Sequence, residues 1–159
     1  MSNEEIIIRN AIGAWKGNID RATKFFVEIE GAKLLEPVVP GRSRVVYILG
    51  HLAATHDRMI ELAGLGERVH PEFDEIFLAS PDRARDLPEI ETIRTWWETV
   101  NQRVLDGINR LTPEEWLAKH SAVSAEDFAK DPLRNRLSIL LSRTNHISYH
   151  LGQVVLQAK

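Results

Sequence analysis

The C-terminal part of the chain carries an unbroken helical repeat of apolar positions. Between residues 132 and 158, such positions recur at alternating steps of four and three: Leu133, Leu137, Leu140, Thr144, Ile147, Leu151 and Val154. This spacing places about one side chain per turn on a single face of a helix, and that face has to be buried against other helices. A chain that contains this segment is therefore expected to fold around packed helices.

Three earlier segments repeat the pattern, and together they predict an all-α protein. Helical spacing of apolar residues runs through residues 4–30, 44–63 and 88–110, and no segment reads convincingly as a strand. Four long amphipathic helices are typical of a four-helix bundle. We found no internal repeat, low-complexity segment or linker, so we expect residues 1–159 to form a single domain, which suits this length and an apolar fraction of 43%.

Capping residues suggest where these helices begin. Asn3, Ser43 and Asp131 are candidate N-caps of the first, second and fourth helices, and Pro88 suits the first turn of the third. Each lies directly before a periodic segment. We therefore expect the fourth helix to start near residue 132 and to continue toward residue 158.

The segments between the helices differ in length. Residues 31–43 read as a loop, whereas residues 65–87 are too long for a hairpin turn, so the third helix need not be the antiparallel neighbour of the second. Short helices are predicted at residues 112–119 and, from a weaker signal, near residues 124–127. The expected fold is thus a bundle with a long second connection and short additional helices.

Composition excludes several classes of function. The formal charge is −3 without a block of Lys or Arg, so nucleic acid is not an expected partner. No apolar run is long enough to span a membrane and no signal segment opens the chain, so we expect a cytoplasmic protein. The chain has no cysteine. A metal ion would have to be held by His, Asp or Glu.

Two histidines stand one helical turn apart in the fourth segment. His146 and His150 are four residues apart, the spacing at which two imidazoles on one helix face can bind one metal ion. On a helical wheel both lie on the flank of the apolar stripe. In the second segment, His51 lies on the corresponding flank, whereas His56 falls on the stripe itself. We interpret His56 as a hydrogen-bonded histidine at the edge of the core, although the wheel alone does not exclude it as a ligand.

The surroundings of these histidines resemble a known family. The two blocks that carry the resemblance are Tyr47-Ile48-Leu49-Gly50-His51-Leu52 and His146-Ile147-Ser148-Tyr149-His150-Leu151-Gly152-Gln153. They are similar to the motifs of the DinB-like family of small four-helix bundles with a three-histidine metal site, although many relatives have Trp at position 47. The resemblance implies that His51, His146 and His150 bind a divalent metal ion. Zinc or nickel are the first candidates, followed by iron or manganese.

Residues beside the motif have alternative interpretations. Gln153 could hold a ligand histidine in place or be solvated, and Arg143 could attract an anionic substrate or be an ordinary exposed arginine. We interpret Gly152 as a packing glycine and Tyr149 as a packing residue. Trp96 is off the apolar stripe, so we expect it to line the pocket or an interface between subunits.

Three functions are compatible with such a site. An open coordination position could activate an external low-molecular-weight thiol, which favours a thiol-dependent S-transferase, in line with enzymes of the wider superfamily. The first alternative is a metal-dependent hydrolase acting on a small molecule. The second is a non-catalytic, stress-related protein that binds a metal or another ligand. The resemblance also implies a homodimer.

Overall fold

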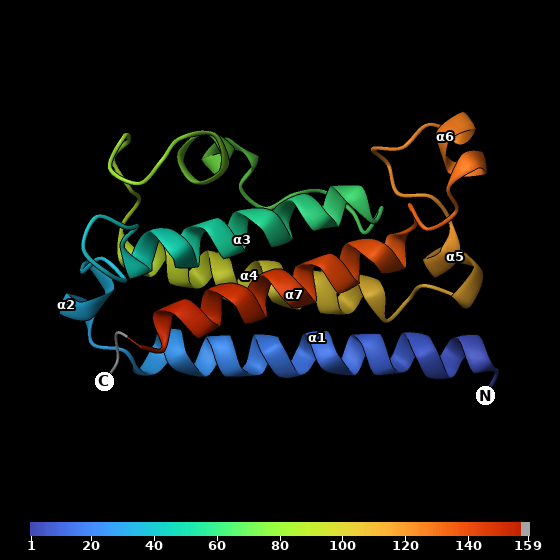
Figure 1. The fold of residues 1–159 in the computed structure, drawn as a ribbon, viewed down its shortest axis with the longest axis horizontal. Coiled ribbons are helices and arrows are strands. Elements are labelled where there is room, and N and C mark those ends of the chain that lie inside the picture. The colour runs from blue at the N-terminus through green and yellow to red at the C-terminus, as the bar shows by residue number, and fades with distance from the viewer. Residues whose placement is uncertain (157–159) are drawn as a thin grey trace.

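A computed structural model describes residues 1–156, and this part of the chain is helical without a β-sheet, which confirms the predicted all-α class. Its four long helices are α1 (Asn3–Glu28), α3 (Val45–Leu62), α4 (Ile90–Ile108) and α7 (Arg136–Val154). They lie side by side along the long axis of the molecule (Figure 1). The predicted four-helix bundle is therefore present.

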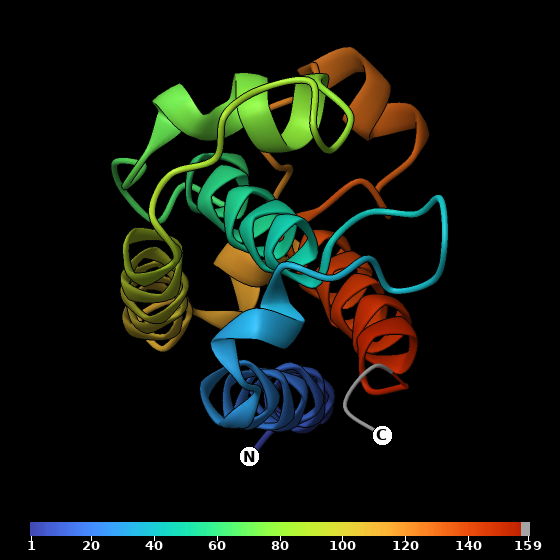
Figure 2. The ribbon, with the colours of Figure 1, turned by 90° about the vertical axis from the view of Figure 1, so that its left-hand side faces the viewer.

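The order of the helices in space differs from that of a simple up-and-down bundle. In Figure 1, α1 and α7 run in one direction and α3 and α4 run in the other. Seen from one end, α3 lies between α4 and α7, with α1 on the opposite side (Figure 2). The third long helix is thus adjacent to the second but parallel to it. This arrangement explains the long connection, because the chain has to return along the bundle between two parallel helices.

We call this return segment, residues 63–89, the crossover. It contains a 3₁₀ turn, η1 (Pro71–Phe73), and a π-helical turn, η2 (Glu75–Ala79), and it passes over the outer side of α3 (Figure 2). Two of its aromatic rings, those of Phe73 and Phe77, contact Trp96 on α4, with ring centroids 5.1 and 5.9 Å apart. Trp96 is 1% exposed, so its predicted place in a pocket or subunit interface is wrong.

The helix starts predicted from capping residues agree with the structure only in part. The first helix is capped by Ser2 instead of Asn3, in a capping box with Glu5. The third begins at Ile90, after Pro88. The second begins at Val45 without a side-chain cap from its N-cap residue, Arg44. A carboxylate distant in the sequence caps this helix start instead. Asp82 in the crossover accepts the backbone N–H of Arg44 at 2.7 Å and pairs with its guanidinium group.

The fourth long helix starts later than predicted. It is capped by Asn135, whose side chain accepts the N–H of Ser138 at 3.0 Å. Asp131 instead ends the short helix α6 (Ala125–Lys130), and residues 132–134 form a turn before α7. The helix ends at Val154, and the part of the prediction that concerns residues 157–158 lies outside the described residues.

The other short helices agree broadly with the sequence. Helix α5 (Pro113–Leu117) starts in a capping box of Thr112 and Glu115, and α6 starts at a Ser124 cap. One additional turn, α2 (Gly31–Leu34), lies in the segment expected to be a loop.

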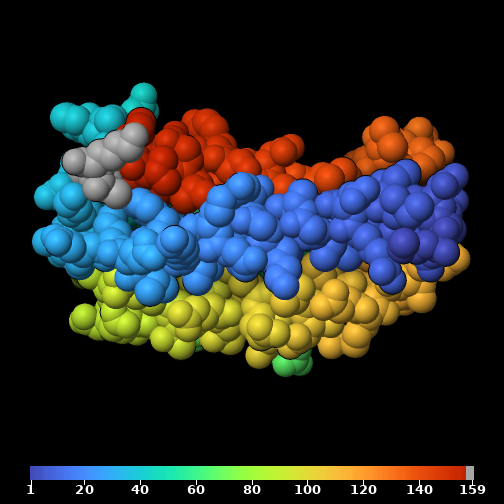
Figure 3. All heavy atoms as spheres, turned by 90° about the horizontal axis from the view of Figure 1, so that it is seen from below, coloured from blue at the N-terminus to red at the C-terminus, as the bar shows by residue number. Residues whose placement is uncertain are grey.

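The apolar stripes of the four long helices meet in one hydrophobic cluster. On the face shown in Figure 3, α1 lies between α7 on one side and α4 on the other. The side chain of Asn18 on α1 ties this helix to α7 by donating to Thr144 O at 3.2 Å and Ser148 Oγ at 2.8 Å. Among the described residues, no helix combines the length and the apolar character needed to cross a membrane.

Candidate metal centre

Helices α3 and α7 bring three histidines together. The buried residues Leu52 and Ile147 hold the facing sides of the two helices in the core, and His51 and the His146–His150 pair lie beside them at the edge of that contact. All three imidazoles are half-buried. The wheel positions inferred from the sequence therefore correspond to neighbouring places in the structure.

The three imidazoles point the same nitrogen toward one place. His146 Nε2 lies 3.1 Å from His51 Nε2 and 3.0 Å from His150 Nε2, and one ligand atom from each residue lies within 4.8 Å of the others. Nitrogen ligands at about 2.0–2.1 Å from a tetrahedral ion would be about 3.3 Å apart. The observed separations are close to this value, so the cluster has the dimensions of a three-nitrogen metal site.

Hydrogen bonds on the far side of the rings determine which nitrogens carry protons. His51 Nδ1 lies 2.8 Å from the carbonyl oxygen of Phe77, and His150 Nδ1 lies 2.9 Å from Gln153 Oε1. Both partners are acceptors, so each Nδ1 carries the proton and donates a hydrogen bond, and each Nε2 keeps a free lone pair. His146 Nε2 can donate to only one of these two lone pairs. At least one of the short N–N contacts therefore lacks a proton, and a cation would satisfy it.

The remaining histidine nitrogen also has an acceptor within reach. His146 Nδ1 lies 3.5 Å from Thr55 Oγ1, and the Thr55 hydroxyl donates to Leu52 O at 2.9 Å. The Thr55 oxygen is thus free to accept a hydrogen bond from the N–H group at His146 Nδ1. In that arrangement all three Nε2 lone pairs face one point, which is the donor set that a divalent ion requires.

Protonation of His146 or His150 does not offer an alternative near neutral pH. Burial, followed by the proximity of His150 and His51, lowers the pKa of His146 to about 4. Burial and His51 also lower the pKa of His150. Both imidazoles are therefore neutral at pH 7, the form that binds metal ions.

The histidines adjoin a pocket of about 550 Å³. His51 and His150 are among its lining residues, and the walls come from the loop before α3, from α3 itself, from η2 and from the end of α7. The lining residues are Val38, Val39, Arg42, Ser43, Tyr47, Ile48, His51, Phe77, Leu78, Tyr149, His150, Gln153 and Leu156. Apolar side chains dominate the lining, and Arg42 is the one charged residue that residues 1–156 contribute to it. A small molecule in this pocket would reach the face of the cluster formed by His51 and His150.

The other residues singled out in the sequence take varied places. Gln153 contacts His150 and lines the pocket, whereas Arg143 is half-buried outside the lining and donates from Nε to Thr55 O at 3.1 Å. Tyr149 is 64% exposed at the pocket instead of being packed. Gly152 is not a packing glycine, because a Cβ there would meet nothing within 4 Å.

His56 does not join the three histidines. It is fully buried among aromatic rings, with centroids 5.5 Å from Trp97 and 6.1 Å from Trp15. Neither of its ring nitrogens has a hydrogen-bond partner among the described residues, so the predicted hydrogen bond is absent. Burial lowers its pKa to about 3, with smaller effects of Arg143 and His146. His56 is thus a neutral core residue.

Two groups that contact the cluster were not predicted from the sequence. One is the backbone carbonyl of Phe77, which any residue could supply and which only the path of the crossover brings to His51. The other is Thr55, one helical turn after His51. Its i+4 spacing from His51 was the one signal that could have pointed to it.

The fold and the site together define a four-helix bundle in which two helices gather three histidines that could hold a metal ion. The family model of the DinB superfamily matches residues 14–154. The chain belongs to this superfamily, as the two motif blocks suggested. A search of curated proteins found no match for the chain.

Proposed function

We propose that His51, His146 and His150 hold a divalent metal ion that serves a thiol-dependent transfer reaction in the adjoining pocket. The observation that supports this most directly is the convergence of the Nε2 atoms, 3.0 and 3.1 Å apart, while Nδ1 of His51 and of His150 donate to acceptors behind them. Neutral ligands would leave the full charge of the ion uncompensated. Such sites act on a bound molecule more often than they serve structure alone.

A metal ion in this position would supply a Lewis acid that lowers the pKa of a bound thiol or water molecule. In the proposed reaction, a low-molecular-weight thiol attacks an electrophilic small molecule. A carbon–sulfur bond forms, the bond to the leaving group breaks, and the thiol proton departs with that group. The chain has no cysteine, so the sulfur comes from the cosubstrate.

The lining of the pocket favours thiol transfer over hydrolysis. Hydrolysis by a metal site is usually assisted by a carboxylate that handles the proton of the attacking water. None of the pocket-lining residues within residues 1–156 is an Asp or Glu. Asp57 on α3 is fully buried and paired with Arg68, away from this lining. A thiol needs less assistance, because its pKa is already near 8.5 before it is lowered.

The walls of the pocket indicate what kind of molecule would bind. Val38, Val39 and Leu78 offer apolar surface, and Arg42 places a positive charge on the same loop. A substrate with an apolar body and an acidic group complements both features.

Metal analysis followed by an activity screen tests the proposal. Purified protein, reconstituted separately with zinc, nickel, iron and manganese, should retain about one ion per chain. It should consume an electrophile only when a thiol is added. Absence of bound metal after reconstitution would refute the site, and turnover of esters or amides without thiol would identify a hydrolase instead. Binding of a ligand that persists in His146→Ala would favour a non-catalytic role.

Two further expectations stay predictions. A homodimer would be detected as twice the chain mass of 18.1 kDa in light scattering. Cytoplasmic location would be detected by cell fractionation.

A further inference from the structure

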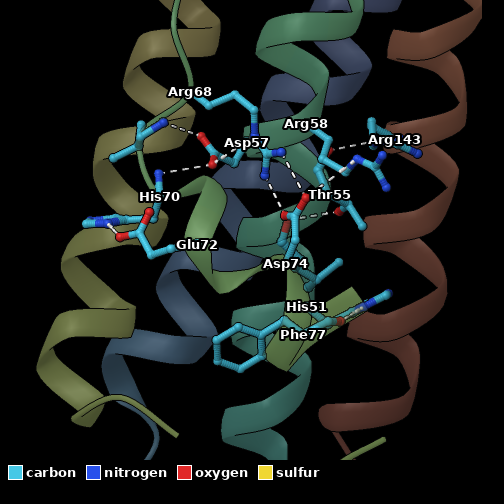
Figure 4. Close-up of polar contacts among 12 residues, drawn as sticks. His51, Thr55, Asp57, Arg58, Arg68, His70, Glu72, Asp74, Phe77 and Arg143 are labelled. Atoms are coloured by element: carbon cyan, nitrogen blue, oxygen red, sulfur yellow. Dashed lines mark hydrogen bonds and ion pairs between the residues drawn. The ribbon is translucent and has the colours of Figure 1, made fainter. Parts of the chain in front are cut away.

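We propose that the ion pairs of Asp57, Arg68 and Asp74 act as a positioning device for His51, by holding the crossover so that the Phe77 carbonyl fixes the tautomer of this imidazole. The inference rests on the proposed metal site and adds to it a set of residues that touch neither metal nor substrate. Figure 4 shows this network between α3 and the crossover, with His51 and Phe77 beyond it.

The network begins at a buried carboxylate. Asp57 on α3 is fully buried, and its oxygens accept the backbone N–H groups of Val69 at 2.6 Å and His70 at 3.1 Å. Arg68 adds a third contact from Nε at 3.3 Å. These residues lie directly before η1, whose N-cap has no side-chain cap of its own. Asp57 therefore supplies the cap from a different helix and ties the start of η1 to α3.

Arg68 carries this connection to the next turn. Its two terminal nitrogens donate to the two oxygens of Asp74, at 2.8 and 2.5 Å, in a bidentate pair. The Arg68 side chain is 12% exposed and that of Asp74 is 30% exposed, so solvent screens this pair less than a pair on the open surface. Asp74 is the residue between η1 and η2. The bidentate pair of Arg68 and Asp74 thus holds the residue at which the chain enters the π-helical turn.

The π-helical turn then presents a single carbonyl to the metal centre. Phe77 lies three residues after Asp74, and its carbonyl oxygen accepts from His51 Nδ1 at 2.8 Å. Its ring fits against Gly50, the residue before His51. A shift of η2 along α3 would therefore separate the carbonyl from the imidazole.

Loss of that acceptor has a defined chemical consequence. With Nδ1–H bonded to a carbonyl, the neutral His51 ring keeps the lone pair on Nε2, the atom that faces the other histidines. Without the acceptor, the proton distributes between the two nitrogens. The fraction of the protein that is ready to bind a metal ion then falls.

The test compares Asp74→Asn and Asp57→Asn with the wild type. Both changes keep the shape of the side chain and remove the charge that pairs with Arg68. Thr112→Ala is the control for lost stability, because it removes the cap of α5 far from His51. Long-range ¹H–¹⁵N spectra of the metal-free proteins at about pH 8, above the usual titration range of histidine, report which ring nitrogen of His51 carries the proton. The imidazole of His120 takes no part in this network, so its signals serve as the internal reference in these spectra.

In the wild type and Thr112→Ala, we expect the proton of His51 on Nδ1. In the Asp variants, we expect a mixture of tautomers and a loss of zinc affinity of about 10–100-fold, measured by competition with a chelator. A folded Asp74→Asn protein in which His51 keeps the wild-type tautomer would overturn the proposal. If Asp57→Asn does not fold, Asp74→Asn decides the question, because Asp74 is partly exposed. If the wild type binds no zinc, the proposed function fails, while the tautomer comparison still tests this inference.

Discussion

Gly50 of α3 packs directly against the ring of Phe77, at a distance that admits no side chain at position 50. A Cβ placed there would lie 2.1 Å from Phe77 Cε1. The glycine therefore allows η2 to approach α3 closely enough for the Phe77 carbonyl to reach His51. A residue outside the histidine cluster thus determines how near the crossover comes to that cluster.

Gly50→Ala is expected to destabilise the protein by about 1–3 kcal/mol, because the added methyl group displaces the Phe77 ring. Urea denaturation measures this change. Gly152→Ala is the matched control, since a Cβ at position 152 meets nothing within 4 Å and α7 gains a better helix former. Equal stability of Gly50→Ala and the wild type would show that the ring can move freely.

Metal binding should depend on each of the three histidines and not on the others. His146→Ala is expected to lose bound zinc in elemental analysis, whereas His120→Ala, which alters a histidine outside the cluster, should keep it. A chelator should lower the melting temperature of the wild type and leave that of His146→Ala unchanged, because a ligand stabilises only the state that binds it. Full zinc content in His146→Ala would contradict the assigned ligand set.

His56 should make stability depend on pH. Burial lowers its pKa from the ordinary value of 6.5, which applies to the unfolded chain, to about 3 in the folded protein. Between these two pH values the unfolded chain binds a proton that the folded protein does not. This contribution is complete above pH 6.5 and is lost progressively as the pH falls toward 3. Substitution His56→Leu should flatten the dependence of the unfolding free energy by at most about 1.4 kcal/mol per pH unit.

The comparison uses metal-free protein in chelator, with urea denaturation at several values between pH 5 and pH 7.5. His146 also has a lowered pKa, and its contribution is common to both proteins. The difference between the two slopes therefore isolates His56. Parallel curves would mean that His56 is protonated in the folded state.

Gln153 should contribute to metal affinity without binding the metal itself. Substitution Gln153→Leu removes the acceptor of His150 Nδ1, so we expect zinc affinity to fall by about 10–100-fold. Gln102→Leu is a suitable control, because Gln102 is an exposed glutamine on α4 that bonds to Asp106. Unchanged affinity in Gln153→Leu would show that this hydrogen bond does not orient His150.

The sequence predicted the parts of the molecule that depend on regular spacing. The stripe from Leu137 to Val154 repeats with the period of a helix, whereas its predicted first member, Leu133, lies in the turn before α7 and is 76% exposed. The four-residue step between His146 and His150 places both on one flank. These spacings are set within one helix, so they do not depend on the path of the rest of the chain. The pairing of His51 with them required either the wheel or the family resemblance.

The parts that could not be predicted depend on contacts between distant residues. The cap at Arg44 comes from Asp82, and the cap before η1 comes from Asp57, so neither boundary is marked in its own segment. Trp96 lies off the stripe of α4 yet is buried, because the crossover covers it. The Phe77 carbonyl leaves no trace in the sequence, since every residue has one.

The parallel course of α3 and α4 also bears on the order in which the protein folds. His51 and His146 are 95 residues apart, and His51 meets the Phe77 carbonyl only after the crossover has returned along α3. Closing such long loops costs entropy before any contact offsets it. We therefore expect the histidine cluster to assemble late, after both the crossover and α7 have docked. A nascent chain would then offer scattered imidazoles and no finished chelate, so metal capture would follow folding instead of directing it.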